Sequence, residues 1–324
     1  MGFARLGLER FPYRKGLHDL GRGAYAWLAP DGSWGWSNAG LVVDGEASLL
    51  VDTLFDLALT REMLDAMRAA EPRAATRIDV LVNTHANGDH CYGNELAAGA
   101  EIVASRASAE EMVETPPEVL AGLVAGVGGQ DTALGRFVQR AFGPFQFEGI
   151  RLVPPTRTFE GQLELRVGDK RVELFELGPA HTRGDVIVHV PGDGVVFTGD
   201  LLFVEGTPIV WEGPVSNWIA ACDRIQALGA AVVVPGHGPI TDRRGPEAVK
   251  AYLEHLVREV RPRFEAGLDA WTAARDIDLG PFAGWSDPER VVVNVDTLYR
   301  ELGAPAPRNL LHLFDRMATY RDFT

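Results

Sequence analysis

The segment from Asn83 to Asn94 reads NTHANGDHCYGN and concentrates side chains that bind metals. His85, Asp89 and His90 lie within six residues, directly after the mostly apolar run 78–82. Such a run is typical of a buried strand, and a rigid strand can aim the side chains of the loop that follows it into a cleft. Imidazole and carboxylate groups together are ligands for zinc, iron or manganese. The segment therefore predicts a metal site at the end of a strand.

Three later segments place similar side chains after apolar runs. His181 lies in GPAHTRGD (178–185), Asp200 ends VFTGD (196–200), and His237 lies in VPGHGP (234–239). Any one of these residues alone is typical of ordinary turn chemistry, so the prediction depends on their joint order. The remaining histidines are expected to lie outside the site, and they are His18, His189, His255 and His312.

Composition excludes several classes of function. The chain has 324 residues and a net charge of -14, which argues against a nucleic-acid partner because no basic stripe offsets it. Its two cysteines provide neither a disulfide framework nor a cysteine-rich zinc module. Its first residues contain no apolar signal segment, and no stretch approaches the roughly 20 apolar residues of a membrane span. We therefore expect a cytoplasmic protein that acts on a small molecule, with no membrane partner.

The hydrophobic pattern alternates between strand and helix signals. Short apolar runs predict strands at 24–29, 39–43, 47–51, 78–82 and 101–104, and further strand signals occur at 163–167, 171–177, 186–190, 195–198 and 231–234. Helical spacing predicts helices at 57–70, from Gly93 onward, and at 215–228, 248–256 and 288–302. Two sheets with helices outside them account for this order.

Two regions depart from that pattern. The segment from about 105 to 150 contains Pro116-Pro117 and many glycines, and it ends in Phe142, Phe145 and Phe147. It is interpreted as an insertion that lines or covers the substrate cleft. After about residue 245 the chain becomes mostly helical, which divides it into a domain at 1–245 and a helical extension at 246–324. A solvated face is the preferred reading of the extension's charged helix, and a cover over the cleft or a homodimer contact is the alternative.

Together the motifs resemble those of the metallo-β-lactamase-fold superfamily of metal-dependent hydrolases. The His-x-His-x-Asp-His signature of that family is matched from His85 to His90, except that Asn87 replaces the second histidine. The other signatures correspond to Ala180–Asp185, to Thr198-Gly199-Asp200 and to Pro235-Gly236-His237-Gly238. The resemblance covers roughly residues 20–245 and implies an αββα sandwich with a metal site at one edge between the sheets.

The resemblance also implies roles for the individual residues. His85, Asn87 and His181 would form a first metal pocket, while Asp89, His90 and His237 would form a second, and Asp200 would bridge them. One or two divalent ions are expected, with zinc as the first choice and iron or manganese as alternatives. Two ions a few ångströms apart would lower the pKa of a bridging water toward about 7 and give hydroxide at neutral pH. Asp89 is the catalytic candidate that orients this hydroxide or moves a proton.

Asn87 leaves two readings open. Its Oδ1 is bonded to Cγ, as Nδ1 is in histidine, so the amide oxygen can occupy nearly the ligand position and favour harder ions. Alternatively, Asn87 only hydrogen-bonds a water, and one ion is held by the second pocket and Asp200.

An aspartate at position 200 resembles the thioesterase, lactonase and sulfatase branches of the family more than the true β-lactamases. Tryptophans near the motifs, including Trp34 and Trp211, suggest an apolar cleft. The leading hypothesis is a hydrolase of an ester, thioester or lactone of a largely apolar small molecule. The alternatives are a polyketide ring cyclase on the same fold and a degenerate metal-binding protein without catalysis.

Overall fold

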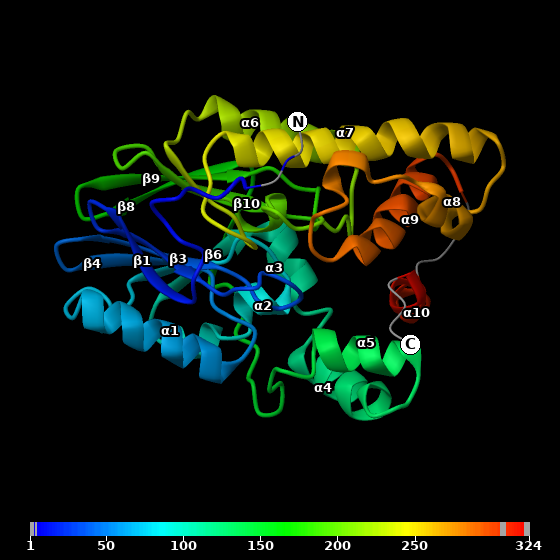
Figure 1. Cartoon of the computed structure of the whole chain (residues 1–324). Coiled ribbons are helices and arrows are strands. Elements are labelled where there is room, and N and C mark those ends of the chain that lie inside the picture. Colours follow the sequence, from blue (N-terminus) through cyan, green and yellow to red (C-terminus); the bar gives the residue numbers. More distant parts are fainter. Residues whose placement is uncertain (1–2, 4, 305–308, 321–324) are drawn as a thin grey trace.

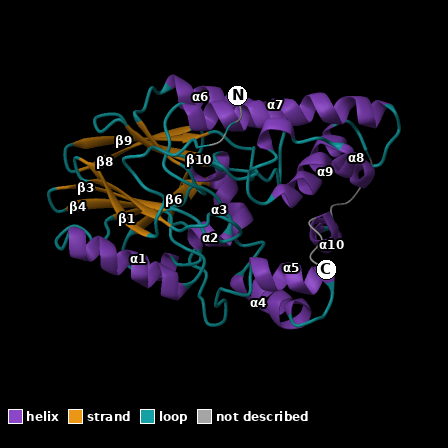
Figure 2. Ribbon diagram, in the orientation of Figure 1, coloured by secondary structure: helices purple, strands orange, loops and turns teal. Residues whose placement is uncertain are grey.

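Two β-sheets pack face to face, and helices cover both outer faces of the pair (Figures 1 and 2). The computed structural model describes residues 3, 5–304 and 309–320. This layering confirms the expected αββα sandwich, because a sheet that is apolar on both faces needs a partner on each side. The helices from residue 244 onward confirm the C-terminal helical extension.

The first sheet has seven strands in sequence order. They are β1 (Gly16–Gly21), β2 (Ala24–Leu28), β3 (Ala39–Asp44), β4 (Ala47–Val51), β5 (Val80–Val82), β6 (Glu101–Ser105) and β7 (Arg157–Phe159). Neighbours are antiparallel from β1 to β4 and parallel from β4 to β7. The pattern did not predict the two edge strands, because β1 is half-exposed and lacks an apolar run and β7 has only three residues.

The second sheet has five strands in the order β12-β11-β10-β9-β8. They are β8 (Gln162–Val167), β9 (Lys170–Glu176), β10 (Val186–Val190), β11 (Val195–Phe197) and β12 (Val232–Val234). All five were predicted from the strand signals in their sequences. Strand β12 runs parallel to β11, since the helix α6 (Val215–Ala227) carries the chain back between them.

Apolar side chains fill each space between the layers. Between the sheets, Val42 and Leu49 of the first sheet share a buried cluster with Val172 and Val188 of the second. On the outer face of the first sheet lies α1 (Leu57–Ala70), as predicted. It buries Met63, Leu64 and Met67, while its N-cap residue Asp56 accepts a hydrogen bond from the backbone N–H of Leu59 at 2.8 Å.

The segment between β6 and β7, which contains the expected insertion, consists of short helices joined by loops. They are α3 (Arg106–Met112), α4 (Pro117–Leu123), a π-helical turn (Val124–Gly128) and α5 (Ala133–Ala141). One predicted helix starts earlier than expected: α2 (Gly88–Cys91) begins inside the His85 motif, and a 3₁₀ turn (Asn94–Ala97) follows it in place of a helix from Gly93.

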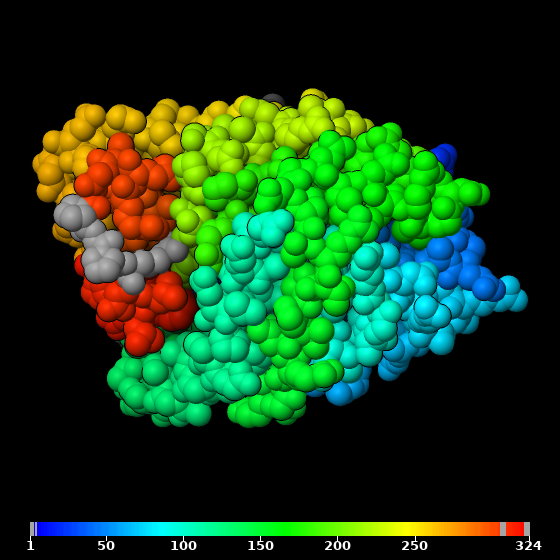
Figure 3. Space-filling model, turned by 180° about the vertical axis from the view of Figure 1, so that it is seen from behind, coloured from blue at the N-terminus to red at the C-terminus, as the bar shows by residue number. Residues whose placement is uncertain are grey.

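The C-terminal helices pack on the sandwich and on the insertion. They are α7 (Arg244–Glu265), α8 (Ala270–Asp276), α9 (Val291–Glu301) and α10 (Leu310–Tyr320). The helix expected at 248–256 is thus part of the longer α7, which packs along α6. Helix α10 lies against α5 of the insertion (Figure 3). Over the described part of the chain, no helix combines the length and apolar character needed to cross a membrane. The domain boundary near residue 245 stays a prediction.

Candidate metal centre

The predicted site residues meet at one edge of the sandwich, just beyond the ends of several strands. Parallel pairing explains part of this convergence. Phe197 of β11 pairs with Val234 of β12, so Asp200 and His237, each three residues farther on, lie at the same level. His85 likewise lies three residues beyond the end of β5. The short helix α2 then carries Asp89 and His90 into the same space.

Four imidazoles surround the carboxylate of Asp200. Its Oδ1 lies 3.1 Å from Nε2 of His90. Its Oδ2 lies 3.6 Å from Nε2 of His85, 3.3 Å from Nε2 of His181 and 3.4 Å from Nε2 of His237. All five residues are at most 3% exposed. The structure therefore brings the predicted bridging carboxylate together with every predicted histidine.

Backbone and side-chain acceptors select which nitrogen of each histidine faces this centre. Nδ1 of His181 donates to the carbonyl oxygen of Ile209 at 2.7 Å, and Nδ1 of His237 donates to that of Gly32 at 3.1 Å. A ring that donates through Nδ1 turns Nε2 toward the centre, where the lone pair of that nitrogen binds a cation once any proton on it is displaced. Both rings thus present Nε2 to Asp200.

Asp52, which lies outside the four sequence motifs, orients the other two histidines. Its Oδ2 accepts hydrogen bonds from Nδ1 of His90 at 2.9 Å and from Oγ1 of Thr84 at 2.8 Å. Because the Thr84 hydroxyl donates its hydrogen bond to Asp52, its oxygen can accept a hydrogen bond from Nδ1 of His85, which lies 2.9 Å away. A carboxylate behind a metal-binding histidine fixes the ring and its tautomer. The only sequence signal for Asp52 is its place directly after an apolar strand.

Asp89 completes the cluster on the side that faces solvent. Its Oδ2 lies 3.3 Å from Nε2 of His237 and 3.9 Å from Nε2 of His90. Asp89 is 8% exposed, which is more than any of the four histidines or Asp200. It is therefore the ionisable group of the cluster that a substrate reaches most directly.

Unpartnered polar atoms show that these residues fit a divalent cation. Nε2 of His85, Nε2 of His90 and Oδ1 of Asp200 are buried and make no hydrogen bond of good geometry, although the last two atoms lie 3.1 Å apart. Leaving such atoms unsatisfied is costly unless a ligand completes them. Two sets of three residues each bring their ligand atoms within 4.8 Å of one another. The first set is His85, His90 and Asp200, and the second is Asp89, His90 and His237. The second set is the expected second pocket, whereas the ligand role of each single residue stays a prediction.

The charges in the metal-free site balance by protonation. Burial alone would lower the pKa of His90 and His237, but Asp200 and Asp89 outweigh it and raise that of His237 to about 9 and that of His90 well above its usual value. Burial lowers the pKa of His181 to about 4 and that of His85 well below its ordinary value. Two histidines thus hold protons that a cation would displace on binding.

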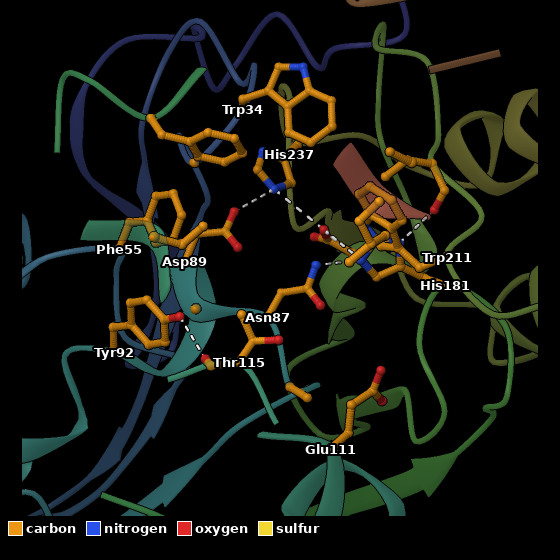
Figure 4. A pocket seen from close by; sticks show the side chains of 18 of the residues that line it. Trp34, Phe55, Asn87, Asp89, Tyr92, Glu111, Thr115, His181, Trp211 and His237 are labelled. Carbon is orange, nitrogen blue, oxygen red and sulfur yellow. Dashed lines mark hydrogen bonds and ion pairs between the residues drawn. The ribbon is translucent and has the colours of Figure 1, made fainter. Parts of the chain in front are cut away.

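Asn87 lies beside the centre. Its Nδ2 is 3.3 Å from Nε2 of His181, and its side chain points into the cavity between His181 and Asp89 (Figure 4). The distance puts the amide at the edge of the predicted first pocket. Whether its oxygen binds an ion stays a prediction.

The other four histidines lie away from the site. Nδ1 of His189 lies 2.9 Å from Oε2 of Glu173 on the neighbouring strand. His18 contacts the carbonyl oxygen of Arg14, His255 that of Asp278, and His312 is exposed on α10. None of these four belongs to the metal-binding groups found among the described residues.

A cavity of about 520 Å³ opens directly onto Asp89, Asp200, His181 and His237. Aromatic rings form much of its wall, and charged side chains also line it. The rings are those of Trp34, Phe55, Tyr92, Phe142, Phe203, Trp211 and Phe314, and the charged residues include Glu111, Glu114, Arg183, Glu212 and Arg290. The cavity is large enough for a small organic substrate.

Comparison with known proteins agrees with this centre. The model of the metallo-beta-lactamase superfamily matches residues 32–237, which contain every predicted ligand. The chain belongs to the metallo-β-lactamase superfamily. This membership confirms the family, the fold and the enzyme superfamily expected from the four motifs.

Curated relatives in this superfamily carry the names of hydrolases. The chain is 26% identical over 213 residues to acyl-coenzyme A thioesterase MBLAC2 of Bos taurus, an alignment that covers 62% of this chain and 72% of that protein. It is 24% identical over 221 residues to hydroxyacylglutathione hydrolase of Maricaulis maris (67% and 62%). It is also 24% identical over 226 residues to linear primary-alkylsulfatase of a Pseudomonas species (63% and 42%). The chain thus spans less than two thirds of the last two proteins.

Solved structures support the fold. The sec-alkylsulfatase Pisa1 from Pseudomonas sp. superposes with a TM-score of 0.66 at 19% identity, covering 90% of this chain and 52% of that one. A metallo-beta-lactamase from Pontibacter korlensis gives a TM-score of 0.57 at 20% identity, covering 74% and 99%. At these identities the likeness concerns the fold alone.

Proposed function

We propose that the chain is a metal-dependent hydrolase that cleaves an ester, thioester or lactone of a largely apolar small molecule. The observation that carries this proposal is the cavity of about 520 Å³, which joins the histidine and aspartate cluster to a wall of aromatic rings. An apolar group can lie along the rings while the scissile bond reaches the end of the cavity that Asp89 and Asp200 line. The relatives named as an acyl-coenzyme A thioesterase and a hydroxyacylglutathione hydrolase support acyl transfer to water.

His85, His90, His181, His237, Asp89 and Asp200 would hold the metal, with Asn87 beside them. A bound divalent ion supplies a water of lowered pKa and a positive charge for the oxygen that gains charge in the transition state.

The protein's own groups provide position and proton transfer. The carboxylate of Asp89, 3.3 Å from Nε2 of His237, faces the cavity and can accept a proton from the attacking water. Asp52 keeps His90 in one orientation, so the cluster stays preorganised. Trp34 and Phe55 exclude bulk water from one side of the cavity and thereby strengthen the electrostatic interactions inside it.

A panel of substrates tests the proposal. Protein loaded with zinc, iron or manganese is assayed with p-nitrophenyl esters, acyl thioesters and lactones, and products are identified by mass spectrometry. We expect hydrolysis that a chelator abolishes and that metal restores, with Asp89→Ala inactive and His255→Ala nearly unaffected. Metal binding without turnover of any substrate would favour the degenerate binding protein. A product that has lost water, rather than gained it, would favour ring closure.

A further inference from the structure

The C-terminal helix α10 forms part of the cavity wall. Leu310 and Phe314, one turn apart on this helix, both line the cavity. They reach it from the end of the chain, more than 70 residues after His237. The helix is anchored by neighbouring positions on the same face, where Leu313 and Met317 are at most 3% exposed within the main apolar cluster. Helix α10 is therefore a fixed wall element.

Phe314 closes the aromatic part of the cavity. Its ring centroid lies 6.4 Å from that of Trp34, 6.4 Å from that of Trp211 and 5.9 Å from that of Phe142. Those three rings come from the loop after β2, from the segment before α6 and from the insertion. Because Phe314 contacts all of them, it joins segments that are distant in the sequence into one continuous apolar surface.

Trp34, whose ring packs edge-on against that of Phe314, is held by two buried neighbours. Its Nε1 donates to Oε1 of Glu289 at 3.3 Å, and the guanidinium of Arg290 lies 4.7 Å from its ring centroid. Both partners are at most 2% exposed. By contrast, Leu310 is 49% exposed although it lines the cavity. The side chain of Leu310 can therefore change in size with less disturbance to the core than Trp34 can.

We infer that Phe314 and Leu310 determine the length of the apolar group that the cavity accepts. This inference rests on the proposed hydrolase function and assigns to α10 the selection of the substrate's apolar group by its length. A longer chain must run past or against the Phe314 ring, since this ring packs against both Trp34 and Trp211, which also contact each other, and adds a third ring to the aromatic wall. Each methylene group of the substrate that becomes buried against the wall, or is no longer buried there, changes kcat/KM by roughly four-fold.

Variants of opposite size test the inference. Phe314→Ala opens the wall, and we expect the kcat/KM optimum along a series of p-nitrophenyl butanoate, octanoate and dodecanoate to move toward the longer esters. Leu310→Phe fills the same region and should move the optimum toward the shorter esters. Leu311→Ala is the matched control, because Leu311 is on the same helix, is 53% exposed and does not line the cavity. It should leave the profile unchanged.

A binding measurement separates this inference from the proposed function. Primary alcohols from butanol to dodecanol are titrated while tryptophan fluorescence is followed, since Trp34 and Trp211 line the cavity. The chain-length preference for binding should shift in Phe314→Ala and Leu310→Phe as it does in catalysis, with metal content unchanged. Identical length profiles in the parent and both variants would overturn the inference even if every ester is hydrolysed. Absence of ester hydrolysis together with shifted alcohol binding would overturn only the hydrolase proposal.

Discussion

Oδ2 of Asp52 accepts a hydrogen bond from Nδ1 of His90 at 2.9 Å. The same oxygen accepts a hydrogen bond from the hydroxyl of Thr84, which in turn is hydrogen-bonded to Nδ1 of His85. One buried carboxylate therefore orients two of the four histidines at the candidate metal centre. Strand β4 makes this possible, because Val51 pairs with Val82 of β5 in parallel register and both strands end at the same edge.

Replacing Asp52 by Asn should weaken metal binding without removing a ligand. An amide at this position holds His90 and His85 less firmly, and the loss of such a supporting group typically costs about 10- to 100-fold in metal affinity. Titration of metal-free protein against a competing chelator measures the change. Asp65→Asn is the control, since this carboxylate is exposed on α1. Equal affinities in the two variants would contradict the prediction.

Metal binding should also depend on the second pocket. Asp89→Ala or His237→Ala is expected to abolish activity and to lower the melting temperature of the metal-loaded protein, because bound metal stabilises the fold by about 2.7 kcal/mol at a hundred-fold excess over Kd. His255→Ala and His312→Ala should keep turnover within a few-fold of the parent. Full activity in Asp89→Ala would remove Asp89 from its proposed role.

The metal-free protein should lose stability as the pH rises from about 6.5 to about 9. Although burial opposes it, Asp200 and Asp89 raise the pKa of His237 from 6.5 to about 9 on folding. The folded state thus binds this proton more tightly than the unfolded state does. Its stabilising contribution is complete below pH 6.5 and is lost as the pH passes through about 9.

Thermal melts of chelator-treated protein across this range measure the effect. His237→Gln should flatten the decline, because the variant has no proton to lose at this position. A melting temperature that rises between pH 6.5 and pH 9 would contradict the assigned sign.

Asn87 should contribute to the more weakly bound of two divalent ions. Its amide lies 3.3 Å from Nε2 of His181, at the predicted first pocket. We expect titration of the metal-free protein to saturate at two ions per chain and Asn87→Ala to lose one of them. Asn87→His should tighten the same ion, because imidazole is the better ligand for zinc. Saturation at a single ion that Asn87→Ala leaves unchanged would show that Asn87 is not a ligand.

The insertion should affect substrate binding but not metal content. Leu120 on α4 lines the cavity, whereas its neighbour Val119 is 52% exposed and does not. Leu120→Ala is expected to raise KM for apolar esters several-fold, since the substrate loses apolar contact. Val119→Ala should leave KM unchanged. Deleting α4 should have the larger effect in the same direction, and unchanged kinetics after the deletion would exclude the insertion from the cleft.

The sequence by itself determined the sandwich and the candidate ligands. Metal coordination restricts residue types strongly, so His85, Asp89 and His90 could be recognised as candidate ligands within one short loop. Asp200 and His237 could be recognised because each follows an apolar strand. The central strands were also predictable, because strands buried on both faces are nearly uninterrupted apolar runs.

Only the tertiary structure decided the roles of Asp52 and α10. An aspartate after a strand is common, and its partners Thr84 and His90 lie 32 and 38 residues away, so the parallel pairing of β4 with β5 was needed to join them. Phe314 lies 280 residues after Trp34, and no local pattern connects the two rings. Ligand identity is a local chemical requirement, whereas the support of the ligands and the shape of the cavity arise from packing between distant segments.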